Sequence, residues 1–564
     1  MNWAPARAIR RWFDSEQGVR DHQISRWLFL RSLGLIYFSA FFSLIFQIRG
    51  LIGPDGILPA GQYLAAVAHA VGPLRLWYAP TLLWLSSSSH ALMILCWVGI
   101  VASLLVVANI WPRAMLVVCL VCFLSFIAAA GAFSEYQSDG MLLEAGFISL
   151  FFVPGGFLPG WGLSRLPSRA SLFLLQWEWF RIYFESGIVK LASGDPEWRH
   201  LTAMDQYYQN GPLPTWIGWY VQHLPHWFQA ATVVATLGME LVLVWMLFLP
   251  RRWRIICFLI VTPWQIAVIL TGNYAFLNYI VLTLGFLLLD DGFLRRFVPA
   301  RWRPAAPVTA NADEETNSDV SPMPHIAPVH YGNQEAAEGQ SGEEEKSSEA
   351  SQFTLIRRQF HAFRIAVTAV VLVWILYATT LPLLQMFWRG IPLPEAPVTA
   401  LEPFRIANQY GLFAVMTPNR YEIEFQGSDD GRTWKAYPFR YKPQDVKQPP
   451  GIYAPYQPRF DWNLWFASLG SWTQYPIVPR TEILLLRNDP AVLSLFAGNP
   501  FPKYPPRFVR AVLWQYWFTT IKEKRETGDW WRRQLLGLYA PTLAIGPDGK
   551  IGVVQESSIV APQD

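Results

Sequence analysis

Apolar runs long enough to cross a membrane recur along this chain, and they limit its fold more than any other feature. A helix that spans a bilayer needs about 20 mainly apolar residues. We read nine such runs, at 27–47, 91–111, 114–133, 141–160, 171–192, 228–249, 254–272, 275–289 and 363–388. With 52% hydrophobic and only 15% charged residues, the chain is also too apolar for an ordinary soluble enzyme. We therefore predict a polytopic α-helical membrane protein with about nine transmembrane helices in a lipid bilayer.

The placement of arginine predicts how these helices are oriented. Residues 1–26 are rich in arginine and are not followed by a small-residue cleavage site, so we expect a retained cytoplasmic N-terminal segment. Counting from there, the other cytoplasmic loops obey the positive-inside rule; they contain Arg113, Arg165, Arg169, Arg251, Arg252, Arg254, Arg295 and Arg296. Residues 27–300 then form a transmembrane domain with exterior loops at 48–90 and 193–227.

The segment 301–360 changes character to Pro, Ala, Ser and acidic residues, as in NADEETNSDVSPMP. Such a composition offers too little apolar surface to bury, so we predict a disordered acidic cytoplasmic linker. The last transmembrane helix, at 361–390, then returns the chain to the exterior.

Residues 391–564 have the composition of an exterior α+β domain. RYEIEFQ and KAYPFRY alternate apolar and polar residues on either side of GSDDGRTW, which predicts a β-hairpin with Asp430-Gly431 in the turn. LAIGPDGKIGVV predicts a second, closing hairpin. RFDWNLWFASLG and PRFVRAVLWQYWFTT space their apolar residues at helical intervals, so we expect a helix at each.

Four charged residues interrupt the run 171–192. On a helix, Glu178, Arg181 and Glu185 share one face, where Arg181 could pair with both acids. Each charge near a membrane centre costs about 2.5–3.5 kcal/mol, so these side chains must face the bundle interior. Lys190 lies near the outer end of the helix, where it can reach the interface. The cluster is either an internal ion-pair network that only fixes helix packing or a functional site. For the second case these four residues are the catalytic candidates.

Other polar side chains in or beside the apolar runs suggest a pocket that opens outward. The candidates for this polar pocket are Asp139, Glu144, Asp195, Arg199, Glu240, Asn273 and Asn278. Asp195 has a second role, since it precedes Pro196 and could cap a short helix there. Spacing alone does not show whether these side chains meet.

Several classes of function are not expected. The chain has no basic block or nucleic-acid motif, which argues against nucleic-acid binding. The four cysteines lie inside apolar runs, so no disulfide framework is predicted. In the outer loop, His223 and His226 flank Pro225 without an acidic residue at helical spacing, and we expect no metal site there. No cofactor is expected.

Several long sequence segments resemble those of the lipase maturation factor family. They are DGMLLEAGF at 139–147, FRIYFESGIVKLASGDPEWRHLTAM at 180–204, TGNYAFLNY, GSDDGRTWKAYPFRYKP at 427–443 and APYQPRFDWNLWFASL at 454–469. The transmembrane region is more distantly similar to the vitamin K-dependent carboxylase-like family. The first resemblance implies a membrane protein that helps secreted lipases to fold and assemble, and it brings no accepted catalytic residues with it.

Two functions remain open. The first, which we favour, is a non-enzymatic maturation factor for secreted proteins such as lipases, whose client contact is the Trp-rich segment 448–475 with Trp462, Trp465, Phe466 and Trp472. The second is a membrane-embedded enzyme related to the carboxylase-like proteins, which would use the charged cluster on a lipid or a secreted substrate. The resemblance implies a bacterial inner membrane, or the endoplasmic reticulum membrane of a eukaryote, so that the exterior domain is periplasmic or lumenal.

Overall fold

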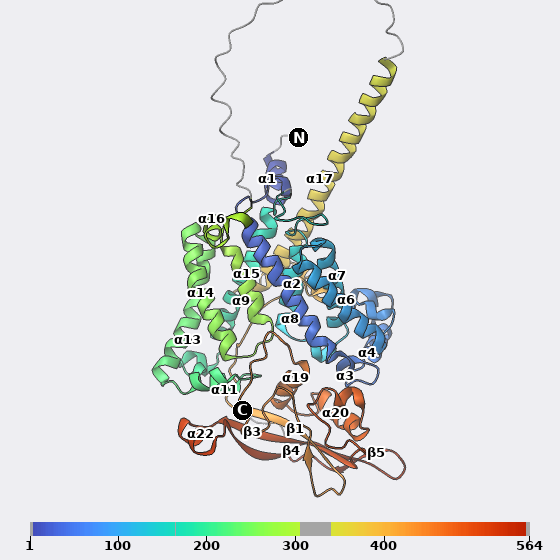
Figure 1. Cartoon of the computed structure of the whole chain (residues 1–564), viewed down its shortest axis with the longest axis vertical. Coiled ribbons are helices and arrows are strands. Elements are labelled where there is room, and N and C mark those ends of the chain that lie inside the picture. The colour runs from blue at the N-terminus through green and yellow to red at the C-terminus, as the bar shows by residue number, and fades with distance from the viewer. Residues whose placement is uncertain (1–3, 164, 305–339, 560–564) are drawn as a thin grey trace, which may run out of the picture.

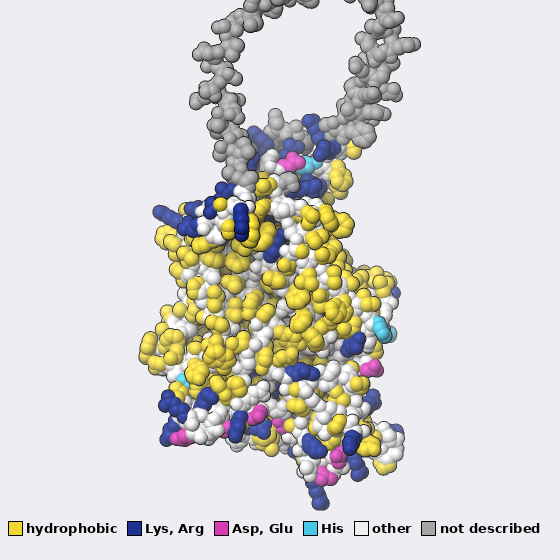
Figure 2. All heavy atoms as spheres, in the orientation of Figure 1, with side chains coloured by type: hydrophobic (Ala, Val, Ile, Leu, Met, Phe, Trp, Pro, Cys, Tyr) yellow, Lys and Arg dark blue, Asp and Glu magenta, His cyan; other side chains and the backbone are white. Residues whose placement is uncertain are grey.

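The protein is a bundle of helices stacked on a β-sheet domain (Figure 1). A computed structural model describes residues 4–163, 165–304 and 340–559. Helices α1 and α16 and the N-terminal part of α17 lie at one end of the bundle, and the sheet lies beyond the other end. Hydrophobic side chains cover the middle of the molecule, while Lys and Arg gather near the α1 end and on the sheet domain (Figure 2). This banding is what a bilayer around the middle of the bundle requires.

The described residues contain five helices that are long and apolar enough to cross a membrane. They are α2 (Gln23–Ile45), α6 (Ser89–Val107), α13 (His226–Leu241) with its extension to Phe248, α14 (Arg251–Thr271) and the Ile356–Gln385 part of α17 (Gln340–Gln385). A sixth span is obtained if the bent pair Leu277–Leu288 and Asp291–Phe297 counts as one. The prediction of a multi-span helical membrane protein is therefore confirmed, whereas the described part of the chain gives five or six spans and not nine.

The missing spans have identifiable causes. The predicted span 141–160 is wrong, because α8 (Gln137–Ser149) has only 13 residues and the VPGGFLPG sequence ends helical structure. α7 (Pro112–Ile127) is shorter than a typical span. At 275–289, α15 (Leu277–Gly285) is followed by a bend of 96° before α16 (Asp291–Leu294), so this run is not one straight helix. α9 (Arg169–Ala192) is long enough but carries the four charges.

Shorter helices lie between the long helices of the bundle and in the C-terminal domain. They are α1 (Ala4–Phe13), α3 (Ile48–Ile52), α4 (Ala60–Val71), α5 (Arg75–Tyr78), α10 (Pro196–Arg199), α11 (Ala203–Asn210), α12 (Trp216–Gln222), α18 (Ala396–Thr399), α19 (Arg459–Ser468), α20 (Ile477–Leu486), α21 (Pro490–Leu493) and α22 (Ile521–Thr527). The helix expected in RFDWNLWFASLG is confirmed as α19. Asp195 caps α10 as predicted, with its side chain accepting from the Glu197 N–H at 2.9 Å.

The predicted linker 301–360 is only partly covered by the described residues. Its stretch 305–339 lies outside them. From Gln340 the chain is helical and runs without a break into the last span, so the prediction of disorder is wrong for 340–360.

The C-terminal domain is built on one antiparallel sheet of five strands in the order β2-β1-β3-β4-β5. The strands are β1 (Arg420–Ser428), β2 (Lys435–Ala436), β3 (Phe508–Phe518), β4 (Trp531–Ile545) and β5 (Ile551–Gln555). Both predicted hairpins are confirmed, and Gly431 supplies the positive φ of 71° in the first turn. The helix expected in PRFVRAVLWQYWFTT is wrong. This β-branched and aromatic sequence forms β3, which pairs with β1 and β4 on its two sides.

Asp461 makes the stability of this domain depend on pH. Its carboxylate in α19 accepts from the Tyr441 and Lys442 N–H groups, at 3.3 and 3.2 Å. Burial raises the pKa of Asp461 from 3.8 to about 6. Because the folded pKa is the higher one, stability is fully present below pH 4 and falls as the pH rises to 6, by about 3 kcal/mol.

We expect the Asp461→Asn variant to lack this loss, since the amide still accepts both hydrogen bonds and does not titrate. In thermal unfolding of the purified full chain between pH 4 and 7, the melting temperature of the variant should rise relative to that of the wild type as the pH increases. The exposed Asp445→Asn is the matched control and should follow the wild type. Parallel curves for Asp461→Asn and the wild type would contradict the assignment.

Candidate functional site

The charges of α9 hold a segment of irregular backbone that includes a turn at 412–413. This segment, 408–416, precedes β1 and is called the strap here. Arg181 Nη1 donates to the Asn408 carbonyl at 2.6 Å. Glu185 Oε2 accepts from the Tyr410 N–H at 2.6 Å, and Lys190 Nζ donates to the Leu412 carbonyl at 3.0 Å. Four residues of helix and two of extended chain both advance about 6–7 Å, so Arg181 and Glu185 meet Asn408 and Tyr410. Lys190 is five residues beyond Glu185 and reaches Leu412, where the strap turns.

The contact continues beyond the charged face. Ser186 Oγ accepts from the Leu412 N–H at 3.3 Å, and Trp198 Nε1 donates to the Phe413 carbonyl at 3.0 Å. Asp195 accepts from the Met416 N–H through the carboxylate oxygen that does not cap α10. The strap is mostly half-buried, with Tyr410 buried, and these contacts give partners to backbone groups that would be costly to leave unpaired away from water.

Glu144 of α8 completes the cluster. It forms a close ion pair with Arg181, and both side chains are buried. Its other oxygen accepts from the Asn408 N–H at 2.9 Å and the Tyr410 hydroxyl at 2.9 Å. The predicted Arg181–Glu185 pair is present at 3.9 Å. The predicted Glu178–Arg181 pair is not formed, because α8 packs on α9 and brings Glu144 to the guanidinium. Both oxygens of Glu178 are buried without a hydrogen-bond partner in the described part of the chain.

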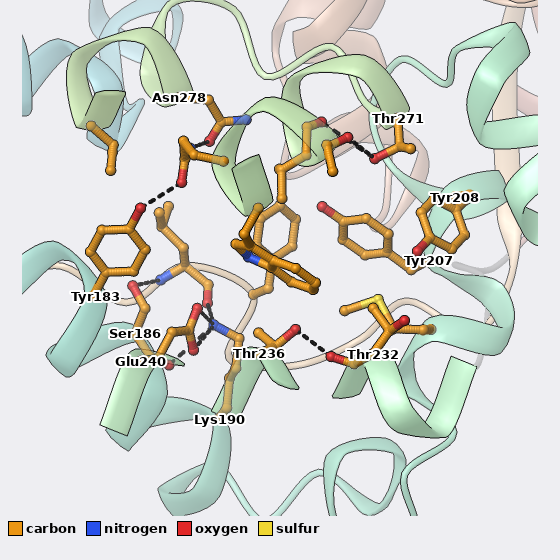
Figure 3. A pocket seen from close by; sticks show the side chains of 18 of the residues that line it. Tyr183, Ser186, Lys190, Tyr207, Tyr208, Thr232, Thr236, Glu240, Thr271 and Asn278 are labelled. Atoms are coloured by element: carbon orange, nitrogen blue, oxygen red, sulfur yellow. Dashed lines mark hydrogen bonds and ion pairs between the residues drawn. The ribbon is translucent and has the colours of Figure 1, made fainter. Parts of the chain in front are cut away.

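Lys190 does not reach the interface as predicted, since only 2% of its side chain is exposed. Its ammonium lies 2.9 Å from both carboxylate oxygens of Glu240 on α13. This pair forms part of the wall of a cavity of about 230 Å³, shown in Figure 3. The walls are mainly aliphatic and aromatic, and Tyr207 and Tyr208 of α11 stand opposite the ion pair.

A short chain of hydrogen bonds crosses another wall of the cavity. The Tyr183 hydroxyl donates to Gln265 Oε1 at 2.7 Å, and Gln265 Nε2 donates to Asn278 Oδ1 at 2.8 Å. These groups come from α9, α14 and α15, so three helices are tied together around the cavity. The site is therefore an apolar chamber with one neutralised ion pair and a few fixed dipoles, which suits a ligand that is mostly apolar.

The residues of the single predicted pocket are distributed among different places. Glu240 and Asn278 line the cavity with Lys190. Glu144 and Asp195 bind the strap, and Arg199 is exposed.

The other two predicted pocket residues hold the C-terminal domain. Asp139 binds Arg459 of α19 through two hydrogen bonds of 2.7 Å. Asn273 donates to the Leu213 and Gly451 carbonyls and accepts from the Tyr453 N–H at 2.7 Å. The sequence predicted the polar character of these residues but not their partners.

Two buried arginines of the C-terminal domain were missed. Arg459 binds Asp139 and the Phe133 carbonyl, the latter at 2.6 Å. Arg420 pairs with Glu422 and donates to the Gln209 carbonyl in the 193–227 loop at 3.0 Å. One signal was available, because α8 contains two acidic residues and no basic one. Their counter-charges had to come from other elements.

The predicted client contact is only partly exposed. Trp462 and Trp465 are 7% and 8% exposed, and the Trp462 ring lies 5.4 Å from that of Tyr136, so these two are not available to a client. Phe466 is 39% exposed, and Trp472 is half-buried. Of the outer-loop histidines, His223 contacts the Trp219 and Thr519 carbonyls, at 2.7 and 2.9 Å, and His226 pairs with Asp205.

These features define an integral multi-pass membrane protein whose C-terminal sheet domain is fastened to the bundle by buried ion pairs and by the strap. The chain belongs to the lipase maturation factor family. The model of the lipase maturation factor transmembrane domain matches residues 24–296, and that of the lipase maturation factor C-terminal domain matches residues 406–541. The resemblance read from the sequence is thus confirmed, and α9 and the strap lie in different matched regions.

Curated relatives agree over nearly the whole chain. Lipase maturation factor 2 of Gallus gallus is 31% identical over 604 residues, covering 95% of this chain and 83% of the relative. Lipase maturation factor 2 of Homo sapiens is 30% identical over 93% of this chain and 83% of the relative. Lipase maturation factor 1 of Bos taurus is 29% identical over 92% and 89%. No solved structure matches.

Proposed function

We propose that this protein is a non-enzymatic maturation factor that assists the folding and assembly of secreted proteins such as lipases. Membership of the family supports the client class, since its relatives are named for lipase maturation. The observation that carries the proposal is the use made of the α9 charges. Arg181, Glu185 and Lys190 each bind the strap backbone, so the residues that could have formed a catalytic cluster serve to hold the C-terminal domain in place.

A rigidly held exterior domain suits a protein that presents a surface to a partner. The strap, Arg459 and Arg420 fix the sheet domain at three separate places on the bundle. A client emerging into the periplasm or the endoplasmic reticulum lumen would meet this domain at a constant height above the membrane. The cytoplasmic location predicted for the arginine-rich end supports this orientation.

The client contact that we propose is the exposed part of 448–475, centred on Phe466 and Trp472. Partly exposed aromatic residues on a well-packed domain are typical of binding hot spots, where truncation costs about 1–2 kcal/mol or more. Neither ring contacts the strap, although the Phe466 ring lies 6.2 Å from that of Tyr136 and Trp472 packs against the core.

We expect Phe466→Ser to reduce the yield of active secreted lipase by about 5- to 30-fold while the abundance of this protein in the membrane stays normal. The measurement is lipase activity in the secreted fraction of cells that co-express both proteins, together with crosslinking from a photoreactive residue at 472. Tyr504→Ser is the matched control, because Tyr504 is 79% exposed elsewhere on the same domain. An equal loss with both variants, or no loss with either, would contradict the contact.

The alternative is a membrane-embedded enzyme like the vitamin K-dependent carboxylases, acting on a lipid or a secreted substrate. The observation in its favour is the cavity beside Lys190 and Glu240, which is large enough for part of a small molecule. The same assay separates the two functions. Chemistry in the cavity would persist in Phe466→Ser, whereas support of the client would not.

A further inference from the structure

A second cavity lies at the α1 end of the bundle, far from the sheet domain. It has a volume of about 200 Å³ and is bounded by the segments around α1, the start of α7, the turn after α8, the start of α9 and α17. Three arginines line it, Arg113, Arg165 and Arg364. None of these residues has a part in the strap, in the first cavity or in the proposed client contact.

The three guanidinium groups have no anionic partner in the described part of the chain. Among the described residues, no carboxylate lies within 4.0 Å of any of them. The one acidic residue of the cavity wall, Asp14, is occupied by the Glu16 N–H at 3.0 Å and by His361 at 3.2 Å. Arg113 donates to the Val153 carbonyl at 2.7 Å, but its Nε is buried without a partner among the described residues. Arg113 is half-buried, whereas Arg165 and Arg364 are exposed, and Arg364 also contacts His361 at 3.2 Å. A half-buried guanidinium with two more at the same cavity wall and no carboxylate beside them can bind an anion through charge-assisted hydrogen bonds.

Two of the groups converge on one small volume. A Cβ atom placed on Gly155 would lie 3.2 Å from Arg165 Nη1 and 3.8 Å from Arg113 Nη1. The absence of a side chain at residue 155 therefore leaves room between the two forks. Ser168, which caps the 24-residue helix α9, also lines the cavity, so the positive end of the helix dipole faces it. Paired guanidinium forks and a helix N-terminus together match a phosphate group.

The surroundings favour a lipid over a free anion. Leu150, Phe151 and Ile365 form an apolar wall beside the arginines. The neighbouring loop exposes the side chains of Phe157 and Leu158. A ligand with a phosphate at one end can bind the arginines, and hydrocarbon at its other end can pack on the apolar wall. Basic pockets between helices near a membrane surface suit anionic lipid headgroups.

We infer that this cavity binds the phosphate group of an anionic phospholipid of the leaflet on the α1 side. The phosphate lies between Arg113 and Arg165, with Arg364 at the rim, and the acyl chains leave along the apolar wall. The inference is independent of the proposed function, because the site is at the opposite end of the molecule from the client contact.

The test is native mass spectrometry of the purified full chain with phosphatidylglycerol, phosphatidylcholine or inorganic phosphate added. We expect phosphatidylglycerol to bind at least about tenfold more tightly than phosphatidylcholine, and Arg113→Gln with Arg165→Gln to remove that preference. Arg252→Gln with Arg296→Gln is the matched control, since both residues are exposed at the same end and the change in charge is equal. Equal loss in the control would show diffuse surface attraction and overturn the inference.

Two further arms of the experiment address a free-anion site and a folding defect. Inorganic phosphate that binds as tightly as phosphatidylglycerol would identify a free-anion site and contradict the lipid. Because Arg113 also holds the Val153 carbonyl, its loss could disturb folding. Arg165→Gln alone is therefore included, because the Arg165 guanidinium donates no hydrogen bond within the described part of the chain. This variant should bind phosphatidylglycerol severalfold more weakly while keeping the thermal stability of the wild type. Unchanged lipid binding in that variant would overturn the inference.

Discussion

Replacing Arg181 with Met is expected to prevent the protein from accumulating in the membrane. The guanidinium is the buried counter-charge of Glu144 and Glu185, and it also binds the Asn408 carbonyl. Its removal leaves buried carboxylates without a cation, at a cost of about 3–5 kcal/mol. That is a large part of the total stability of a typical protein. Membrane abundance and thermal unfolding in detergent are the measurements.

The cause of this loss can be tested by neutralising the acids as well. In the triple variant Arg181→Met, Glu144→Gln and Glu185→Gln, the amides still accept from the strap N–H groups but carry no charge. We expect abundance to recover in large part. Arg199→Met is the control, because Arg199 is exposed a short distance beyond the same helix. A triple variant no more stable than Arg181→Met would show that unpaired charge is not the reason.

Replacing Arg459 with Met is expected to loosen the C-terminal domain from the bundle. Arg459 is fully buried, and it binds both oxygens of Asp139 at 2.7 Å and the Phe133 carbonyl at 2.6 Å. Breaking one side of such a pair costs about 3–5 kcal/mol, since the other charge stays buried. Limited proteolysis of the full chain should cut between the last span and β1 in the variant and spare the wild type.

A double-mutant cycle separates the ion pair from the other contacts of Arg459. Asp139→Asn combined with Arg459→Met removes both charges, and we expect the double variant to resist proteolysis better than Arg459→Met alone. Arg487→Met, at an exposed position of the same domain, should behave as the wild type. Strictly additive effects of the two substitutions would mean that the pair does not couple the domain to the bundle.

The sequence predicted those elements whose local pattern agrees with their tertiary surroundings. The two hairpins followed from turn residues such as Gly431, and α19 followed from helical spacing. β3 was missed because it is central in the sheet and apolar on both faces, so its residues do not alternate. α8 was placed too far along the chain because apolar composition continues past Pro154, where the helix has already ended.

The candidate site was predictable in its residue types but not in its partners. The spacing of Glu178, Arg181 and Glu185 showed that these charges must be buried, and they are. It could not show that Glu144 would replace Glu178 as the partner of Arg181, since that depends on how α8 packs on α9. The contacts of the strap could not be predicted from the sequence for a related reason. Its contribution is made largely by backbone N–H and carbonyl groups, which every residue except proline possesses.

The strap also sets the order in which this protein can be completed during synthesis. Tyr410, whose N–H is held by Glu185, follows it by 225 residues in the chain. At a translation rate of about 5–20 residues per second, roughly 10 to 45 s pass between the appearance of the two. Throughout that interval α8 and α9 are already made, while the carbonyl and N–H groups that their charges bind have yet to be translated. The helical bundle therefore reaches its final structure only after the segment beyond the last span has been synthesised and has folded back against it.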